Sequence, residues 1–186
     1  MLYYLHCLVI NDPSNERDKF EVTDENRQTL TDLKHYLARV PGKLDYRKGI
    51  IFSGSVGTGK TMILEMLKSC ITDLWGKQLE IFTAPYIKQQ FYVDNDGHVN
   101  MSWKAQNYPY LGINDIGLEL ATGSGDEIIR TVLYERFEKR FYTFGTTNLS
   151  FDQMYKRYEY HDEVGRMADR FKHLSNYVNL TGESFR

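Results

Sequence analysis

The sequence predicts an α/β fold in which a mainly parallel, five-stranded sheet is flanked by helices. Short apolar segments bounded by turn residues alternate along the chain with longer segments whose apolar residues recur at helical spacing. Strands that alternate with helices are joined by right-handed crossovers, so their sheet is largely parallel and carries helices on both faces. The 186 residues, 41% of them hydrophobic and 26% charged, are enough for one sizeable core.

The individual strands are predicted from short runs of apolar and β-branched residues. In chain order they span residues 49–52, 79–83, 110–113, 141–147 and 176–180. Helices are predicted from apolar spacing and from residues that favour helix ends. Thr23 and Ser150 are suited to cap two helices, and Gly76 to end the helix that starts near Lys60.

The chain is expected to form one domain over residues 1–186, in which residues 1–45 are an N-terminal arm and helix, because no repeat or long linker divides it. The apolar segment 2–10 is too short to span a bilayer and follows no basic segment. Cys7 and Cys70 are far apart, as expected for reduced thiols. We therefore expect a cytoplasmic protein that does not cross a membrane.

The strongest motif is Gly-Ser-Val-Gly-Thr-Gly-Lys-Thr at residues 54–61, which matches the phosphate-binding pattern G-x-x-x-x-G-K-[ST]. A predicted strand precedes it and a predicted helix follows it. The glycines let backbone N–H groups surround a phosphate, Lys60 reaches the β- and γ-phosphates, and the Thr61 hydroxyl binds Mg²⁺. The motif therefore predicts ATP with Mg²⁺, bound by Gly54, Ser55, Val56, Gly57, Thr58, Gly59, Lys60, Thr61 and Met62.

Polar residues follow two of the other predicted strands. Asn114 and Asp115 end the run 110–113, and Asn148 follows the strand 141–147. Ligands bind at the carboxyl edge of parallel sheets, so these side chains are expected beside the phosphate loop. Thr61, Asn114 and Asp115 are predicted to form the Mg²⁺ site, and the Asn148 amide could hold the attacking water or the γ-phosphate.

The remaining features point less clearly to a function. The five histidines include no pair at metal-ligand spacing, so no zinc site is expected. The net charge of −2 excludes a uniformly basic nucleic-acid-binding surface but leaves room for a local basic patch. Aromatic and basic residues alternate at 154–161, and Trp103-Lys104 and Lys139-Arg140 are weaker hints of a surface that faces DNA. A half-buried helix or loop is the preferred interpretation of the first segment.

Several further segments form an ordered set with the phosphate loop. They are Gly112-Ile113-Asn114-Asp115-Ile116-Gly117-Leu118-Glu119, residues 133–137 leading to 146–149, Gly165-Arg166-Met167-Ala168-Asp169-Arg170-Phe171, and residues 182–186. In this order they resemble the AAA+ ATPases. The chain is most similar to the bacterial helicase-loader family (DnaC-like) and the related helper ATPases of insertion-sequence transposition (IstB-like). The resemblance runs from about Tyr46 to the end.

This resemblance implies a AAA+ core of the P-loop NTPase class. Lys60 and Thr61 would bind nucleotide and metal, Asp115 would polarise the attacking water, and Asn148 would be the first polar sensor. Arg170 falls where the family has its arginine finger, which completes a neighbouring subunit's site, and Arg166 could assist it. The implied protein is an ATPase that works slowly as a homo-oligomer on single-stranded DNA, with a replicative helicase as its partner.

Two departures from the family leave alternatives open. Asn114 stands where the family usually has Asp, and no C-terminal lid domain with its second sensor arginine is expected. The first alternative is a transposition helper that marks target DNA for a transposase. The second is a nucleotide-dependent interaction module with little turnover, as Asn114 suggests. A nucleoside or other small-molecule kinase would need lid arginines that the sequence does not offer.

Overall fold

Five strands form one sheet in which every neighbouring pair is parallel, in the order β2-β3-β4-β1-β5. The computed structural model describes residues 23–91, 101–119, 125–158 and 166–181. The strands are β1 (Gly49–Ser53), β2 (Glu80–Thr83), β3 (Tyr110–Ile116), β4 (Tyr142–Thr147) and β5 (Ser175–Asn179). The predicted parallel, five-stranded sheet is confirmed.

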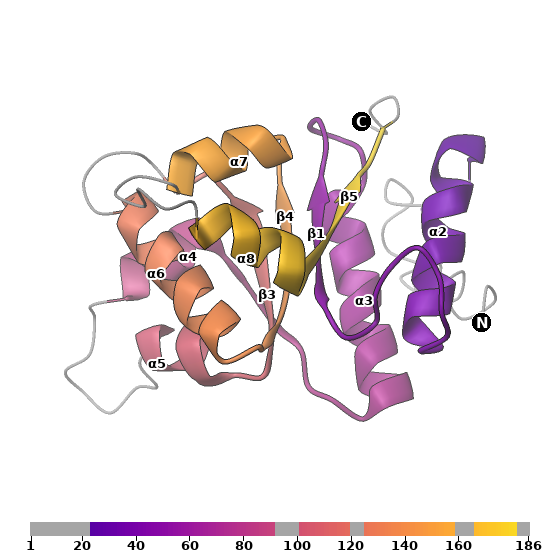
Figure 1. Cartoon of the computed structure of the whole chain (residues 1–186), viewed down its shortest axis with the longest axis horizontal. Helices are drawn as coiled ribbons and strands as arrows, with labels where there is room; N and C mark the ends of the chain where they lie inside the picture. The colour runs from indigo at the N-terminus through magenta and orange to yellow at the C-terminus, as the bar shows by residue number, and fades with distance from the viewer. Residues whose placement is uncertain (1–22, 92–100, 120–124, 159–165, 182–186) are drawn as a thin grey trace, which may run out of the picture.

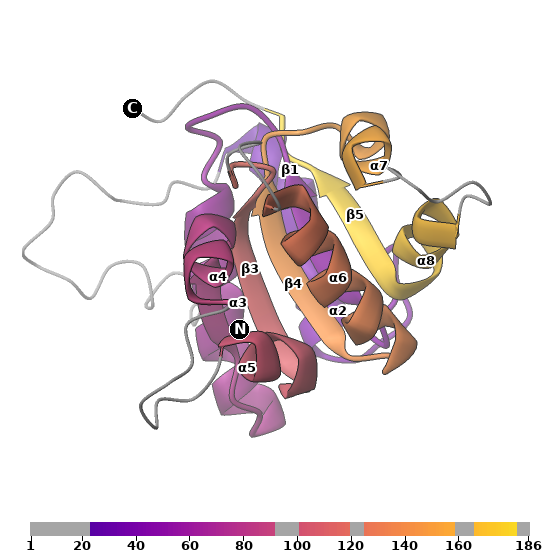
Figure 2. The same ribbon diagram turned by 90° about the vertical axis from the view of Figure 1, so that its left-hand side faces the viewer.

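Helices cover both faces of this sheet, as Figures 1 and 2 show. On one face lie α2 (Asp24–Leu37) and α3 (Lys60–Trp75). The other face is covered by α4 (Ala84–Gln90), α5 (Met101–Asn107), α6 (Gly125–Glu138), α7 (Phe151–Tyr158) and α8 (Arg166–Leu174). None of these described helices combines the length and apolar character needed to cross a bilayer.

The central strand β1 shows why the sheet is buried on both sides. Ile50 and Phe52 pack into the core beneath α2 and α3, whereas Ile51 packs into the second core beneath α4 to α8. All three side chains are fully buried. Successive side chains of a strand point to opposite faces, so a strand covered on both sides is continuously apolar. Burying each of these side chains stabilises the fold by about 1.5–3 kcal/mol.

The predicted helix ends are present. The Thr23 hydroxyl accepts the Asn26 N–H at 3.3 Å and the Asn26 amide oxygen accepts the Thr23 N–H at 3.0 Å, which forms a capping box for α2. Gly76 ends α3 in the left-handed conformation, at φ 61°. Ser150 caps α7 through a reciprocal pair of hydrogen bonds with Gln153.

The structure differs from the predicted elements in two places. β3 continues through Asn114 and Asp115 to Ile116, although these polar residues are poor strand formers and were expected to end it. Helix α5 was not predicted, because its seven residues are too few to show a clear apolar period. The apolar segment 2–10 and Cys7 lie outside the described residues.

Candidate nucleotide-binding site

The phosphate loop joins the carboxyl end of β1 to the start of α3. Gly54 has φ 148°, and a Cβ atom placed on it would lie 2.3 Å from the Leu180 carbonyl oxygen, so no side chain fits there. Gly59 precedes α3 in the left-handed conformation, at φ 79°, and no side chain caps the helix. The N–H groups of the first turn therefore remain free to bind an anion, which the helix dipole also favours.

The ammonium group of Lys60 lies inside this loop. Its Nζ donates to the carbonyl oxygens of Gly54 at 2.9 Å and Ser55 at 2.6 Å, and to the Thr58 hydroxyl at 3.4 Å. Only 7% of the residue is exposed. Burial lowers the pKa of Lys60, and the charge of Asp115 opposes this shift. All three acceptors are neutral, so a phosphate would place a negative charge in direct contact with the ammonium, in addition to the charge of Asp115.

The loop is tied to the neighbouring strand ends by one amide oxygen. Asn114 Oδ1 accepts a hydrogen bond from the Thr61 hydroxyl at 3.2 Å and another from the Thr146 hydroxyl at 2.5 Å. Asn114 and Thr146 are both buried. The hydroxyl of α3 and the amide at the end of β3 therefore lie within direct contact, as the predicted Mg²⁺ site requires.

Asp115 stands beside this pair in an uncommon backbone conformation. Its φ is 59°, a value that side chains other than those of Asn and Asp seldom tolerate. The Asp115 N–H donates to the Thr146 hydroxyl at 2.9 Å, and Asn114 Nδ2 donates to the Asp115 carboxylate at 3.1 Å. Asn114 and Asp115 together face Thr146 across a bulge in the β3–β4 pairing. The bulge allows both polar residues to contribute to the same edge.

A buried carboxylate holds the turn that follows Asp115. Glu119 is fully buried, accepts the Gly117 N–H at 2.9 Å, and accepts a hydrogen bond from the Tyr158 hydroxyl of α7. Arg157, also on α7, donates to the Glu119 carbonyl oxygen at 2.9 Å. Burial raises the pKa of Glu119, while the bonds from Tyr158 and Gly117 and the charge of Arg157 oppose the shift. This anchor fixes the backbone after Asp115 against α7.

Glu119 and Thr146 were given no role by the sequence prediction. Both lie inside segments that carry the family resemblance, but nothing in their local spacing indicates their contacts. Thr146 is linked to Asn114 across 32 positions and Glu119 to Tyr158 across 39. A hydroxyl just before the polar end of a strand is the signal that could have indicated Thr146.

The other predicted residues lie around this centre or apart from it. Within the loop, Ser55 and Val56 are exposed, and Met62 is half-buried in the first turn of α3. Asn148 follows β4 at the same edge, but its side chain is exposed and makes no hydrogen bond to the Thr61–Asn114 pair within the described residues.

Arg170 is not brought to the loop of its own chain. Its guanidinium lies 3.8 Å from the centre of the Tyr134 ring and pairs with Glu138, the last residue of α6. Its Nη1 is buried and has no hydrogen-bond partner among the described residues. The side chain of Arg166 lies outside the described part.

The residues present fit a magnesium nucleotide. The uncapped helix start and Lys60 suit the phosphates, and the hydroxyl, amide and carboxylate oxygens of Thr61, Asn114 and Asp115 are the ligand types that Mg²⁺ prefers. A neutral amide in place of a carboxylate weakens this donor set without removing it.

Comparison with known proteins finds similar proteins that are named for roles in DNA replication. No protein-family model matches the chain. It is 25% identical, over 180 residues, to the replicative helicase loader DnaI of Bacillus subtilis (strain 168). The matched region covers 89% of this chain and 56% of that protein. The chain thus spans little more than half the length of this curated relative.

Solved structures share the fold. A crystal structure of DnaI matches with a TM-score of 0.68 and 21% identity, covering 93% of this chain and 91% of that one. The DnaC helicase loader matches with a TM-score of 0.71 and 18% identity, covering 89% and 96%. The replication initiator DnaA, bound to AMPPCP and single-stranded DNA, matches with a TM-score of 0.63 and 16% identity, and the match covers 92% of this chain and 51% of that one.

The phosphate loop between β1 and α3, on a sheet of this order, and the shared fold define a P-loop NTPase core of the AAA+ class. The chain resembles the helicase loader DnaI in sequence and shares its fold with the DnaI and DnaC loaders.

Proposed function

We propose that the chain binds Mg²⁺-ATP at this site and hydrolyses it slowly, as a homo-oligomer assembled on single-stranded DNA, in support of a replicative helicase. The name of the curated relative supports the helicase as partner. The DnaA structure with AMPPCP and single-stranded DNA supports the nucleotide and the DNA. Residues 1–186 would act as one cytoplasmic core domain, with residues 1–45 as its arm and first helix.

The observation that carries this proposal is the hydrogen bond between the Thr61 hydroxyl and Asn114 Oδ1. It joins two oxygen ligands that are 53 positions apart in the chain. A bound Mg²⁺ would neutralise charge that develops on the phosphates. Thr61 and Asn114 would hold the ion, directly or through water, while Lys60 would orient the β- and γ-phosphates.

The remaining roles concern the attacking water and the transition state. The Asp115 carboxylate would accept a hydrogen bond from that water and orient it, and the Asn148 amide would contact the γ-phosphate. Arg170 of a neighbouring subunit would approach the phosphate from outside, because in its own chain it lies against α6. Hydrolysis would then depend on assembly.

A second candidate is a nucleotide-dependent interaction module with little turnover. Asn114 favours it, because an amide adds no negative charge to the metal site. Asn114 Nδ2 also donates to the Asp115 carboxylate and so engages the group proposed to orient water. In this case ATP binding would change the chain's partners, and hydrolysis would contribute little.

Restoring the acid at Asn114 separates the two candidates. Asn114→Asp is expected to leave ATP affinity similar, to lower the Mg²⁺ concentration needed for half-maximal activity by about tenfold, and to raise turnover, because a charged ligand binds the ion more strongly. The measurement is steady-state ATP hydrolysis across a Mg²⁺ titration. Asn179→Asp makes the same chemical change at the end of β5, beside Ser53, and is the matched control. Identical Mg²⁺ curves for wild type and Asn114→Asp would mean that Asn114 faces away from the metal.

A further inference from the structure

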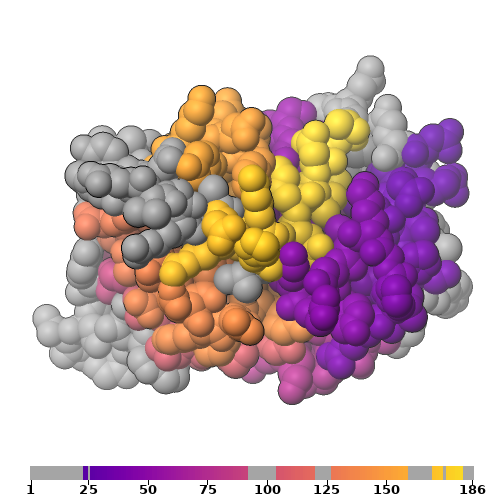
Figure 3. Space-filling view, in the orientation of Figure 1, coloured from indigo at the N-terminus to yellow at the C-terminus, as the bar shows by residue number. Residues whose placement is uncertain are grey.

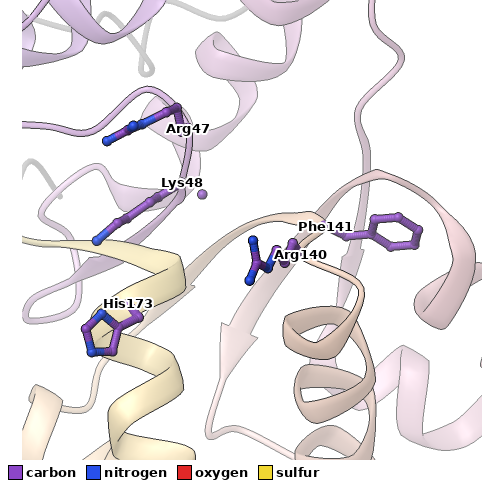
Figure 4. Close-up of a pocket in the computed structure, with 6 residues that line it drawn as sticks. Arg47, Lys48, Arg140, Phe141 and His173 are labelled. Carbon is purple, nitrogen blue, oxygen red and sulfur yellow. The ribbon is translucent and has the colours of Figure 1, made fainter.

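A basic hollow lies at the edge of the sheet opposite the phosphate loop. It has a volume of about 420 Å³ and is lined by Arg47, Lys48, Gly49, Arg140, Phe141 and His173 (Figure 4). These residues precede β1, β4 and β5 or stand at the start of β1, and the three strands are neighbours in the sheet. The hollow therefore occupies the amino edge, whereas the nucleotide site occupies the carboxyl edge.

Two of its cations form no ion pair among the described residues, although the charge of Lys48 helps to lower the pKa of Asp45. The Arg140 guanidinium makes no ion pair or hydrogen bond with any described residue, and the Lys48 ammonium donates only to the Lys172 carbonyl oxygen, at 3.3 Å, in the described structure. Arg47, by contrast, is held by both carboxylate oxygens of Asp45. The His173 ring lies 3.1 Å from the Asp169 carboxylate.

The backbone at Arg140 gives a second reason to consider its side chain. Arg140 follows α6 in the left-handed conformation, at φ 53°, where glycine or asparagine is usual. Arg39 has the same conformation after α2, at φ 54°, but its guanidinium stacks on Trp75 at 4.7 Å. Arg140 has no such contact among the described residues. Arg140 therefore has a backbone conformation that is unfavourable for arginine, and its guanidinium makes no stabilising contact with the described residues.

The chemistry of the lining favours a phosphate group. An Arg fork and a Lys point charge are both suited to phosphate oxygens. The Phe141 ring points away from the other labelled side chains of the hollow (Figure 4). The Arg136 guanidinium lies 5.8 Å from the centre of this ring. The hollow thus offers neither the apolar anchor typical of a protein interface nor a surface on which a base could stack. The hollow would therefore recognise a ligand by the ligand's negative charge alone.

We propose that this basic hollow binds backbone phosphates of single-stranded DNA. The choice of DNA as the source of the phosphates rests on the proposed function, but the charge arrangement does not. Figure 3 shows α8, the segment before β1 and the end of α6 meeting on one face of the molecule, where a strand could pass over them. Because the chain has a net charge of −2, binding of a polyanion needs a local basic patch of this kind.

The test is the affinity of the full-length, nucleotide-free chain for a labelled oligothymidine, measured by fluorescence anisotropy over a series of salt concentrations. Arg140→Gly is expected to weaken binding by about tenfold at low salt and to reduce the salt slope by roughly 0.7, the value for one phosphate contact on a single strand. Adding Lys48→Gln should lower the slope by roughly the same amount again.

Two controls separate binding from folding and from net charge. Arg140→Gly should melt at or above the wild-type temperature, because glycine suits the left-handed position. Lys139→Gln removes the same charge from the adjacent residue, whose ammonium is bonded to Gln106 and Asn107 instead. It should leave the salt slope unchanged.

Unchanged affinity and slope in the double variant would overturn the proposal, as would an equal loss in Lys139→Gln. A duplex of the same length that bound as tightly, with the same response to the variants, would overturn the preference for a single strand. The nucleotide site is tested separately, by titrating the same variants with Mg²⁺-ATP, which they should bind like wild type. If Lys60→Ala leaves ATP binding unchanged while Arg140→Gly still weakens DNA binding, the proposed function fails and the phosphate site stands.

Discussion

Replacing Lys60 with alanine is expected to abolish measurable ATP binding while leaving the fold intact. The Lys60 ammonium lies inside the phosphate loop, and its hydrogen bonds to described residues all go to neutral oxygens. A bound phosphate would therefore form a charge-assisted hydrogen bond with it. Such contacts contribute about 1.5–3 kcal/mol each, so the loss should be about 100-fold or more in affinity. The fold should persist because a desolvated charge, rather than apolar packing, is removed. Titration with a fluorescent ATP analogue measures the effect, and thermal melting checks the fold.

The matched control for this change is Lys68→Ala. Lys68 is on the same helix, but it is solvent-exposed, and its one ion pair among the described residues is with Glu65, at 3.8 Å. It should bind ATP like wild type. A folded Lys60→Ala variant with unchanged affinity would mean that residues 54–61 do not hold the phosphates.

Arg170→Ala is expected to bind ATP nearly normally yet to hydrolyse it slower by a factor of about 10³, if the residue acts as an arginine finger does in other P-loop enzymes. In the isolated chain Arg170 lies on Tyr134 and pairs with Glu138, so it must leave these contacts to reach a neighbouring subunit. Mixing Arg170→Ala with Lys60→Ala should restore part of the activity. One variant then offers an intact loop and the other an intact arginine.

The local contact of Arg170 needs its own control. Glu138→Gln breaks the ion pair with Arg170 but keeps the arginine, so it should retain most of the hydrolysis. If Glu138→Gln is as impaired as Arg170→Ala, and the mixture of the other two variants stays inactive, Arg170 stabilises α6 and α8 within one chain. Its role between subunits would then be rejected.

The parts of this fold that could be predicted depend on local patterns. The strand 49–52 is continuously apolar, and the glycines and lysine that follow can be recognised without any knowledge of distant residues. Helix ends at Thr23 and Gly76 follow from the chemistry of single positions. These elements are determined by sequence neighbours, so spacing and composition were enough to locate them.

The parts that could not be predicted depend on contacts between distant segments. The strand 110–113 was expected to end at Asn114 and Asp115, because the Thr146 hydroxyl that stabilises their extended pairing is 32 positions away from Asn114. Arg136 is fully buried and donates to the carbonyl oxygens of Ala105, Tyr108 and Tyr142, although an arginine in a helix is usually exposed. The burial of the Glu119 carboxylate likewise depends on a hydrogen bond from Tyr158 of α7, which is distant in the sequence. No local pattern indicates which charged residue will find its partners inside the protein.

The most direct test of the central claim is steady-state ATP hydrolysis per chain, measured over a range of chain concentrations with and without single-stranded DNA. If active sites form between subunits that assemble on DNA, the rate per chain rises with concentration, and DNA shifts this rise to lower concentrations. High salt should weaken the DNA effect, because it competes for the phosphate contacts. A rate per chain that stays constant over the whole range, with or without DNA, would contradict the claim.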